Sequence, residues 1–236
     1  MSYELYMTRG IFITGTDTGV GKTYIAERIA VGLRQQGVDV GVMKPAETGC
    51  RLRDGRLLPA DALRLMSAAE CKDSLELVNP YCFRQPLAPA VAAGLTRRKI
   101  DPKKIVSAFR TLAARHDFMV VEGAGGILVP LSIQYAYGDL ASAIKLPVII
   151  VARPGLGTIN HTLLTVSALQ LRRIAIAGII INHADERRAG LVERTSPSVI
   201  AEISKMKILG TVRHGEEKLE GIVEQILSLP FSRSGK

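Results

Sequence analysis

The chain is poor in cysteine, and its few cysteines do not form a recognisable pattern. Cys50, Cys71 and Cys82 are an odd number at wide spacings and include no Cys-x-x-Cys pair. This predicts neither a disulfide framework nor a zinc site, and we expect reduced thiols. The four histidines show no metal-ligand spacing either, so we interpret all of them as structural or peripheral.

Long hydrophobic runs are also missing. Apolar stretches such as residues 174–181 are far shorter than the roughly 20 residues that a membrane-spanning helix needs. The first residues lack the basic-then-apolar order of a signal peptide. We therefore expect a cytoplasmic protein with no membrane partner.

Aromatic residues are few, and this limits what the positive charge can mean. A formal net charge of +9 is typical of some nucleic-acid-binding proteins. Here the basic residues form short scattered clusters without interleaved aromatics, such as Arg97-Arg98-Lys99 and Lys103-Lys104. No helix-turn-helix, zinc-finger or RNA-recognition signature accompanies them. We expect no nucleic-acid partner, and a basic surface that attracts anionic ligands.

What the chain does have is a regular alternation of apolar runs and helical patterns, which predicts an α/β fold with a mostly parallel sheet and helices on both faces. At 236 residues without a linker-like stretch, residues 1–236 are expected to form a single domain. Ligands of such sheets bind at the carboxyl ends of the strands. The predicted strands cover residues 11–13, 38–43, 118–121, 148–152, 176–181 and 208–212. The predicted helices follow the first loop and then cover residues 60–69, 103–115, 158–172, 198–204 and 218–227.

Residues 15–23 form a glycine-containing turn that ends in Gly-Lys-Thr, between an apolar run and an amphipathic helix. Curled backbone N–H groups, the helix N-terminus, the Lys22 ammonium and the Thr23 hydroxyl together predict a site for a nucleoside triphosphate and magnesium. A dinucleotide-binding turn is excluded, because Tyr24 stands where that motif needs a third small residue. The expected nucleotide contacts are Thr18, Gly19, Val20, Gly21, Lys22, Thr23 and Tyr24.

Polar side chains also follow the second predicted strand. Lys44 and Thr48 lie in a turn shaped by Pro45 and Gly49, which predicts a second anion site, although a surface lysine in a tight turn gives the same pattern. Asp61 begins the next predicted helix. It is either a charge favoured by the helix dipole or a magnesium ligand.

The third and fifth predicted strands end in polar residues as well. Glu122 follows four apolar residues, the arrangement by which nucleoside triphosphatases place a metal-linked acid beside the phosphate loop. Asn182 closes the fifth strand, where an amide suits recognition of a base edge. The Asn-x-x-Asp spacing is only faintly similar to that of guanine-binding proteins, since His183 replaces their lysine.

Taken together, these blocks resemble the dethiobiotin synthetase family of P-loop ATP-dependent ligases, which close the ureido ring in the penultimate step of biotin synthesis. The match runs over most of the chain. Five residues separate Gly15 from Gly21, one more than in the general motif, and this spacing is characteristic of the family. The blocks are residues 15–23, Lys44-Pro45 with Thr48-Gly49, Asp61-Ala62, 81–89, 121–126, 157–161 and Asn182.

The resemblance implies a reaction in three stages. One amine of 7,8-diaminononanoate captures CO2, supplied as bicarbonate, to form a carbamate. The γ-phosphate of ATP is transferred to that carbamate, and the second amine then closes the ring and releases phosphate. In this scheme Lys22 and the loop N–H groups hold the phosphates, while Thr23, Asp61 and Glu122 hold Mg2+.

The same resemblance assigns the substrate site. Lys44 neutralises the carbamate and Thr48 supplies a hydroxyl, so these two residues and Lys22 form the catalytic set. Thr18 and Gly125 line the diamine site. Asn160 reaches the carboxylate of the diamine across a homodimer interface, so that each active site is shared between two subunits.

The sequence departs from the family at one place, and two other classes remain as alternatives. Val212 is followed by Arg213-His214 rather than by the family's Pro-containing turn, which leaves base selectivity open. Cobyrinate amide synthases share the phosphate loop and residues 157–161, but they carry a further glutaminase domain. Partitioning ATPases have an early second lysine in the loop, where this chain has Asp17.

Overall fold

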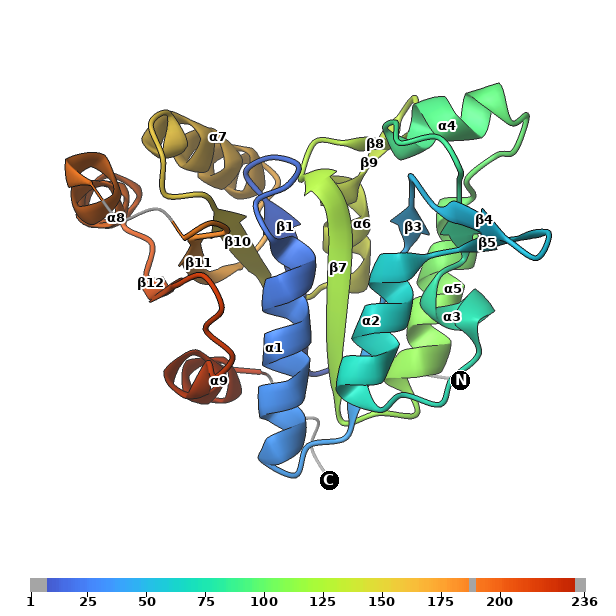
Figure 1. Cartoon of the computed structure of the whole chain (residues 1–236), viewed down its shortest axis with the longest axis horizontal. Coiled ribbons are helices and arrows are strands. Elements are labelled where there is room, and N and C mark those ends of the chain that lie inside the picture. The colour runs from blue at the N-terminus through green and yellow to red at the C-terminus, as the bar shows by residue number, and fades with distance from the viewer. Residues whose placement is uncertain (1–7, 187–189, 232–236) are drawn as a thin grey trace.

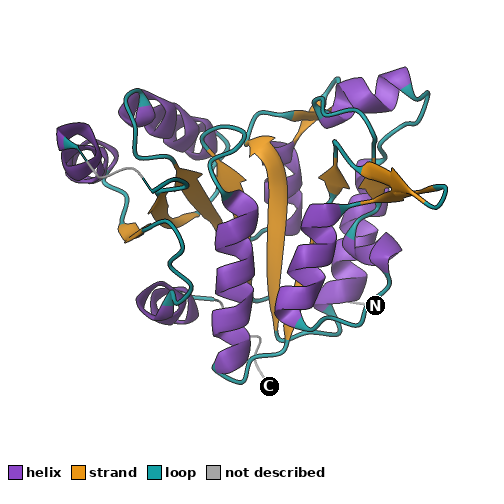
Figure 2. Ribbon diagram, viewed as in Figure 1, coloured by secondary structure: helices purple, strands orange, loops and turns teal. Residues whose placement is uncertain are grey.

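The computed structural model describes residues 8–186 and 190–231. At its centre lies a six-stranded sheet whose five pairings are all parallel, which confirms the predicted sheet (Figure 2). The strands at residues 10–15, 40–43 and 148–152 are buried on both faces, as expected of near-continuous apolar runs, whereas the edge strand at 208–212 is partly exposed. From edge to edge the order is β12 (Ile208–Val212), β11 (Ile176–Asn182), β10 (Val148–Ala152), β1 (Gly10–Gly15), β7 (Phe118–Gly126) and β2 (Val40–Met43).

Helices pack on both faces of this sheet (Figure 1). α1 lies across the front of the sheet with α2 and α9 beside it, whereas α5 and α6 lie behind. α1 and α9 approach closely, since a Cβ on Gly32 would lie 2.6 Å from Val223. The helices are α1 (Lys22–Gln35), α2 (Ala60–Ala69), α3 (Leu75–Val78), α4 (Pro89–Leu95), α5 (Pro102–Ala113), α6 (Tyr137–Ile144), α7 (Thr158–Leu171), α8 (Leu191–Ser204) and α9 (Glu220–Leu227).

Most predicted elements are confirmed, and the differences have local causes. β7 continues to Gly126 rather than ending near 121, because Gly15 of β1 still pairs with Gly126. α8 begins at Leu191 rather than at 198, since the helix continues through Pro197 despite the backbone N–H that proline lacks. α3, α4 and α6 were not predicted. They are four to eight residues long, too short for a helical period to stand out.

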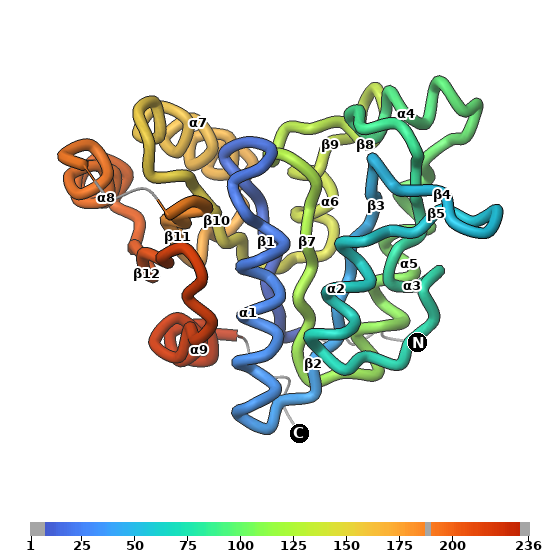
Figure 3. Tube along the Cα trace, viewed as in Figure 1, coloured from blue at the N-terminus to red at the C-terminus, as the bar shows by residue number. Residues whose placement is uncertain are grey.

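Three small two-stranded sheets lie beside the main one. β3 (Ala46–Glu47) pairs with β6 (Tyr81–Cys82), β4 (Arg51–Arg53) with β5 (Arg56–Leu58), and β8 (Pro130–Ser132) with β9 (Tyr135–Ala136). In Figure 3 the loop between β1 and α1 lies at the same edge of the main sheet as the carboxyl end of β7. The polar residues predicted to follow the strands are therefore brought to one edge. Among the described residues, no helix is both long and apolar enough to span a bilayer.

Candidate active site

The loop between β1 and α1 has the conformation that a phosphate site requires. Gly19 and Gly21 adopt positive φ angles of 75° and 89°, and Gly21 immediately precedes α1, so the loop can turn its N–H groups inward. Asn182, at the end of β11, donates from Nδ2 to the carbonyl of Val20 at 2.9 Å. A Cβ on Gly21 would lie 2.0 Å from that nitrogen, so the loop and Asn182 fit together only with glycine at this position.

Lys22 is a buried cation whose burial is only partly offset by the nearby carboxylates of Glu122, Asp61 and Asp17. Its Nζ donates to the carbonyl of Asp17 at 3.3 Å. Burial, followed by repulsion from Lys44, lowers the pKa of Lys22 to about 8. An anion placed in the loop would favour the charged form, so the geometry and the charge both suit phosphate.

The buried Lys44 ammonium lies between two carboxylates, of which Glu122 is buried and Asp61 is partly exposed. Its Nζ lies 2.5 Å from Oε1 of Glu122 and 3.0 Å from Oδ2 of Asp61, and its side chain is 4% exposed. Burial disfavours the ammonium, but the attraction and hydrogen bonds of Glu122 and Asp61 outweigh it and raise the pKa of Lys44. The alternative of a surface lysine in a tight turn is therefore wrong, and Lys44 stays protonated across the neutral range.

The same carboxylates extend to the phosphate loop, which suits a magnesium ion. Thr23 Oγ1 donates to Oε1 of Glu122 at 2.8 Å. Among the described residues, Oε2 of Glu122 is buried without a hydrogen-bond partner, so it is left with unused acceptor capacity. A hydroxyl and two carboxylates are hard oxygen donors of the kind that Mg2+ prefers. The residues present therefore fit the ion predicted from the sequence.

Three residues that the sequence analysis missed hold this arrangement in place. Glu47 is buried, and its carboxylate accepts from the N–H groups of Asp61 and Ala62 at 3.0 Å each, which satisfies the first turn of α2. Asn79 Nδ2 donates to the Lys44 carbonyl at 2.6 Å. Tyr137 donates its hydroxyl to the carbonyl of Ala46 at 3.2 Å. The sequence did contain a signal for this role of Glu47. Pro59, at the start of α2, has no side chain that can cap the helix, so the first N–H groups need an acceptor from elsewhere in the chain.

A cavity of about 580 Å3 connects the phosphate loop with Lys44, Asp61 and Glu122. Its lining also includes the apolar segment 86–89 and Val129, together with Thr18, Thr48 and Gly125. The predicted residues that line the cavity are Thr18, Gly19, Gly21, Lys22, Thr23, Tyr24, Lys44, Thr48, Asp61, Glu122 and Gly125.

Three predicted residues do not line this cavity: Val20, whose side chain is buried although its backbone belongs to the phosphate loop, Asn160 and Asn182. Asn160 is exposed in the first turn of α7. Asn182 lies beneath the phosphate loop, where its Nδ2 is already used and its Oδ1 has no hydrogen-bond partner among the described residues. The loop after β12 approaches the nucleotide side, since Tyr24 donates its hydroxyl to the carbonyl of Glu216 at 2.6 Å. A base contact by Asn182 stays a prediction, with Oδ1 as the available acceptor.

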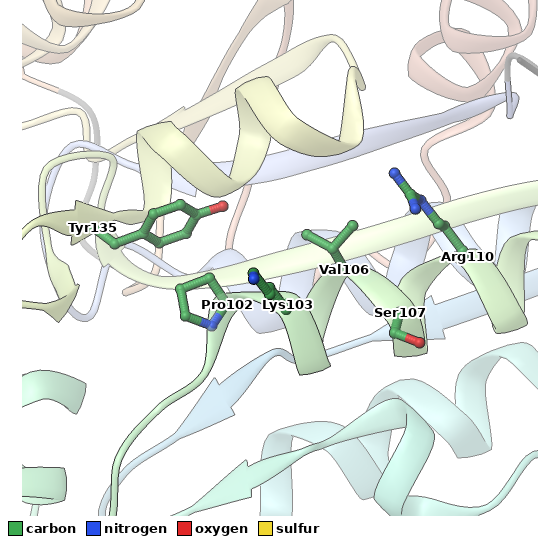
Figure 4. Close-up of a pocket in the computed structure, with 6 residues that line it drawn as sticks. All are labelled: Pro102, Lys103, Val106, Ser107, Arg110 and Tyr135. Atoms are coloured by element: carbon green, nitrogen blue, oxygen red, sulfur yellow. The ribbon is translucent and has the colours of Figure 1, made fainter.

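A second concavity, of about 450 Å3, lies against α5. Figure 4 shows Tyr135 facing Pro102 and Val106, with Lys103 and Arg110 also along that helix. It contains none of the residues predicted for nucleotide, metal or substrate. The predicted residues gather instead around the cavity beside the phosphate loop.

The lowered pKa of Lys22 predicts how nucleotide affinity depends on pH. Above pH 8 the free protein loses this positive charge, whereas a bound triphosphate retains it, so binding must take up a proton. We expect the affinity for a non-hydrolysable ATP analogue, measured by calorimetry with Mg2+, to fall roughly tenfold between pH 7 and pH 9. The Lys22→Met variant should bind the analogue more weakly at both pH values, and its affinity should change little between them. An equal fall in the variant would assign the titration to another group.

Comparisons with known families and structures support the fold. A family model described as an AAA domain matches residues 9–218. The chain is similar in structure to a MinC:MinD cell division complex from Aquifex aeolicus, at TM-score 0.60 and 18% identity over 96% of this chain and 100% of that one. It is also similar to a ParA family ATPase from Chlorobium tepidum, at TM-score 0.54 and 18% identity over 96% of this chain and 94% of that one. At this identity the likeness shows the fold alone.

Curated relatives are far more similar in sequence. "ATP-dependent dethiobiotin synthetase BioD" of Thermodesulfovibrio yellowstonii is 44% identical over 86% of this chain and 88% of its own length. The protein of the same name from Methanocaldococcus jannaschii is 39% identical over 88% of this chain and 95% of its own length. The one from Anaeromyxobacter sp. (strain K) is 51% identical over 74% of this chain and 77% of its own length. The chain therefore belongs to the ATP-dependent dethiobiotin synthetase family.

Proposed function

We propose that this protein uses Mg2+ and ATP to carboxylate 7,8-diaminononanoate and close it to dethiobiotin, with release of ADP and phosphate. The observation that carries the proposal is the buried Lys44 ammonium, which lies between Glu122 and Asp61 in the cavity that also holds the phosphate loop. A plain phosphatase has no need of a second buried cation beside the γ-phosphate. A reaction that joins two anions does, because carbamate and phosphate repel each other.

The phosphate loop and its neighbours would bind the nucleotide. The N–H groups of Gly19, Val20 and Gly21 and the Lys22 ammonium suit the β- and γ-phosphates. Thr23, Glu122 and Asp61 would hold Mg2+, which screens phosphate charge when bound. The same two carboxylates hold the Lys44 ammonium in the lining of the cavity.

Lys44 would then act on the reacting atoms. A carbamate oxygen must attack phosphorus while both groups carry negative charge, and an ammonium fixed between them lowers that repulsion. In a site from which water is excluded, one such group typically contributes about 3 kcal/mol or more to the transition state. The Thr48 hydroxyl, on the wall of the same cavity, is placed to donate to the carbamate or to the transferred phosphoryl group.

The diamine would occupy the less charged part of the cavity. Its hydrocarbon chain suits the apolar segment 86–89 and Val129, and its amines would approach between Thr18 and Gly125. Its carboxylate would then project away from the phosphates. Because Asn160 is exposed on α7 and does not line this cavity, we propose that it reaches the carboxylate of a substrate held by a partner subunit. The active unit is accordingly a homodimer, and we expect it in the cytosol.

The first prediction concerns the products. With Mg2+, ATP, the diamine and freshly dissolved C18O2 in unlabelled water, the protein should form one ADP, one phosphate and one dethiobiotin per turnover. Since a carbamate oxygen becomes the bridge to phosphorus, the phosphate should carry one 18O by mass spectrometry. ADP release that is unaffected by the diamine, with no ureido product, would overturn the proposal.

A second prediction concerns the shared site. Lys22→Ala and Asn160→Ala chains should each be inactive, but equal mixing with free exchange makes half the dimers hybrids, and each hybrid has one site with both groups intact. Activity should recover to roughly a quarter of wild type. The matched control mixes Lys22→Ala with Lys44→Ala, which belong to the same site and should not recover. If the Asn160 mixture stays inactive although native mass spectrometry shows hybrids, Asn160 does not complete a partner's site.

A further inference from the structure

A cysteine, an aspartate and a histidine that are distant in sequence meet where β2 and β7 begin. Cys71 follows α2, Asp73 precedes α3, and His116 lies just before β7. Cys71 Sγ lies 3.2 Å from Oδ2 of Asp73, and Nε2 of His116 lies 2.6 Å from the same oxygen. All three ligand atoms lie within 4.8 Å of one another. None of these residues lines the active-site cavity.

The cluster has supporting contacts of the kind that surround metal ligands. His116 lies between two carboxylates, with Nδ1 3.0 Å from Oδ1 of Asp39 and Nε2 2.6 Å from Oδ2 of Asp73. With Nδ1–H donating to Asp39, loss of the proton from Nε2 would leave that nitrogen to bind an ion, as in carboxylate–histidine–zinc arrangements. Arg115 Nη1 donates to the second oxygen of Asp73 at 2.6 Å, so that carboxylate has one oxygen fixed and the other directed at Cys71 and His116. Asp39 and Arg115 therefore orient two of the three ligand residues.

The backbone leaves room for the imidazole. A Cβ on Gly41 of β2 would lie 2.5 Å from Cδ2 of His116, so the ring packs directly against the strand. The side chains of His116 and Asp73 are 12% and 6% exposed. This is closed enough to hold the ligands in one arrangement and open enough for a water molecule to complete a coordination shell.

We propose that Cys71, Asp73 and His116 form a zinc site, with water as the fourth ligand. Thiolate, imidazole and carboxylate are the ligand types of zinc. Tetrahedral binding would move the ligand atoms apart by roughly 1 Å, given metal–ligand bonds of about 2.0–2.3 Å. As the Zn–S and Zn–N bonds form, the thiol proton of Cys71 and the Nε2 proton that His116 directs at Asp73 leave to solvent. Once the thiol is deprotonated, the Asp39 and Asp73 carboxylates and the Cys71 thiolate are negative, and the Arg115 guanidinium opposes them. A divalent cation neutralises the negative charge that remains.

Such an ion would join the connection between α2 and α3 to the beginning of β7. Asp61 lies in the first turn of α2 and Cys71 just past its end, so the metal would fix the end of α2 remote from the active site. The site is therefore structural, and it does not depend on the proposed reaction.

Metal binding tests the proposal directly. Tag-free full-length protein, held in excess Mg2+ so that the active-site carboxylates are occupied, should bind one Zn2+ per chain in competition with a chromogenic chelator. Co2+ should give a thiolate-to-cobalt charge-transfer band in the near-ultraviolet. Cys71→Ser should abolish that band, and both Cys71→Ser and His116→Gln should weaken Zn2+ binding by at least a hundredfold. Asp39→Asn, a positioning residue, should weaken it about 10–100-fold.

Matched controls come from elsewhere in the chain. Cys82→Ser and His214→Gln should leave the affinity and the cobalt band unchanged, and chelation should lower the melting temperature of wild type but not of Cys71→Ser. The absence of stoichiometric binding would overturn the proposal. So would binding that survives both Cys71→Ser and His116→Gln, because the metal would then be held elsewhere.

Discussion

A buried ammonium between two carboxylates is the interaction on which the active site depends. Lys44 follows β2, Glu122 lies within β7 and Asp61 lies in α2, so their contacts form only when three separate elements are in register. Removing such charges from water costs several kcal/mol per ion. The hydrogen bonds at 2.5 and 3.0 Å offset this cost without making the arrangement a source of stability. Function, rather than stability, explains why these charges are buried.

The surrounding residues make sense as supports for this charge arrangement. Glu47 fixes the start of α2 and so fixes Asp61, while Asn79 holds the backbone of Lys44. Asn182 supports the phosphate loop from the end of β11. The consequence is a site whose cations are set before any ligand arrives, which is the arrangement that stabilises developing charge most effectively.

The sequence predicted what depends on local pattern. Val/Ile runs located the strands of the main sheet, and the order of glycine, lysine and threonine located the phosphate loop. Apart from the set of Thr23, Asp61 and Glu122 that the family resemblance implied, it did not predict partnerships between distant residues. Glu47 as the cap of α2 joins positions 14 and 15 residues apart, and the short helices α3, α4 and α6 depend on packing rather than on their own periodicity. His116 and Cys71 had no metal-ligand spacing in the sequence, because only the fold brings them together.

The central claim is that the two buried lysines have separate tasks, and matched variants test it most directly. Lys44→Met and Lys22→Met each remove one charge while keeping an unbranched side chain. Affinity for an ATP analogue with Mg2+ and the single-turnover rate of dethiobiotin formation should both be measured. The account predicts that Lys44→Met keeps nucleotide affinity within about threefold and loses a hundredfold or more in rate, whereas Lys22→Met loses both. Equal loss of nucleotide affinity in the two variants would contradict it.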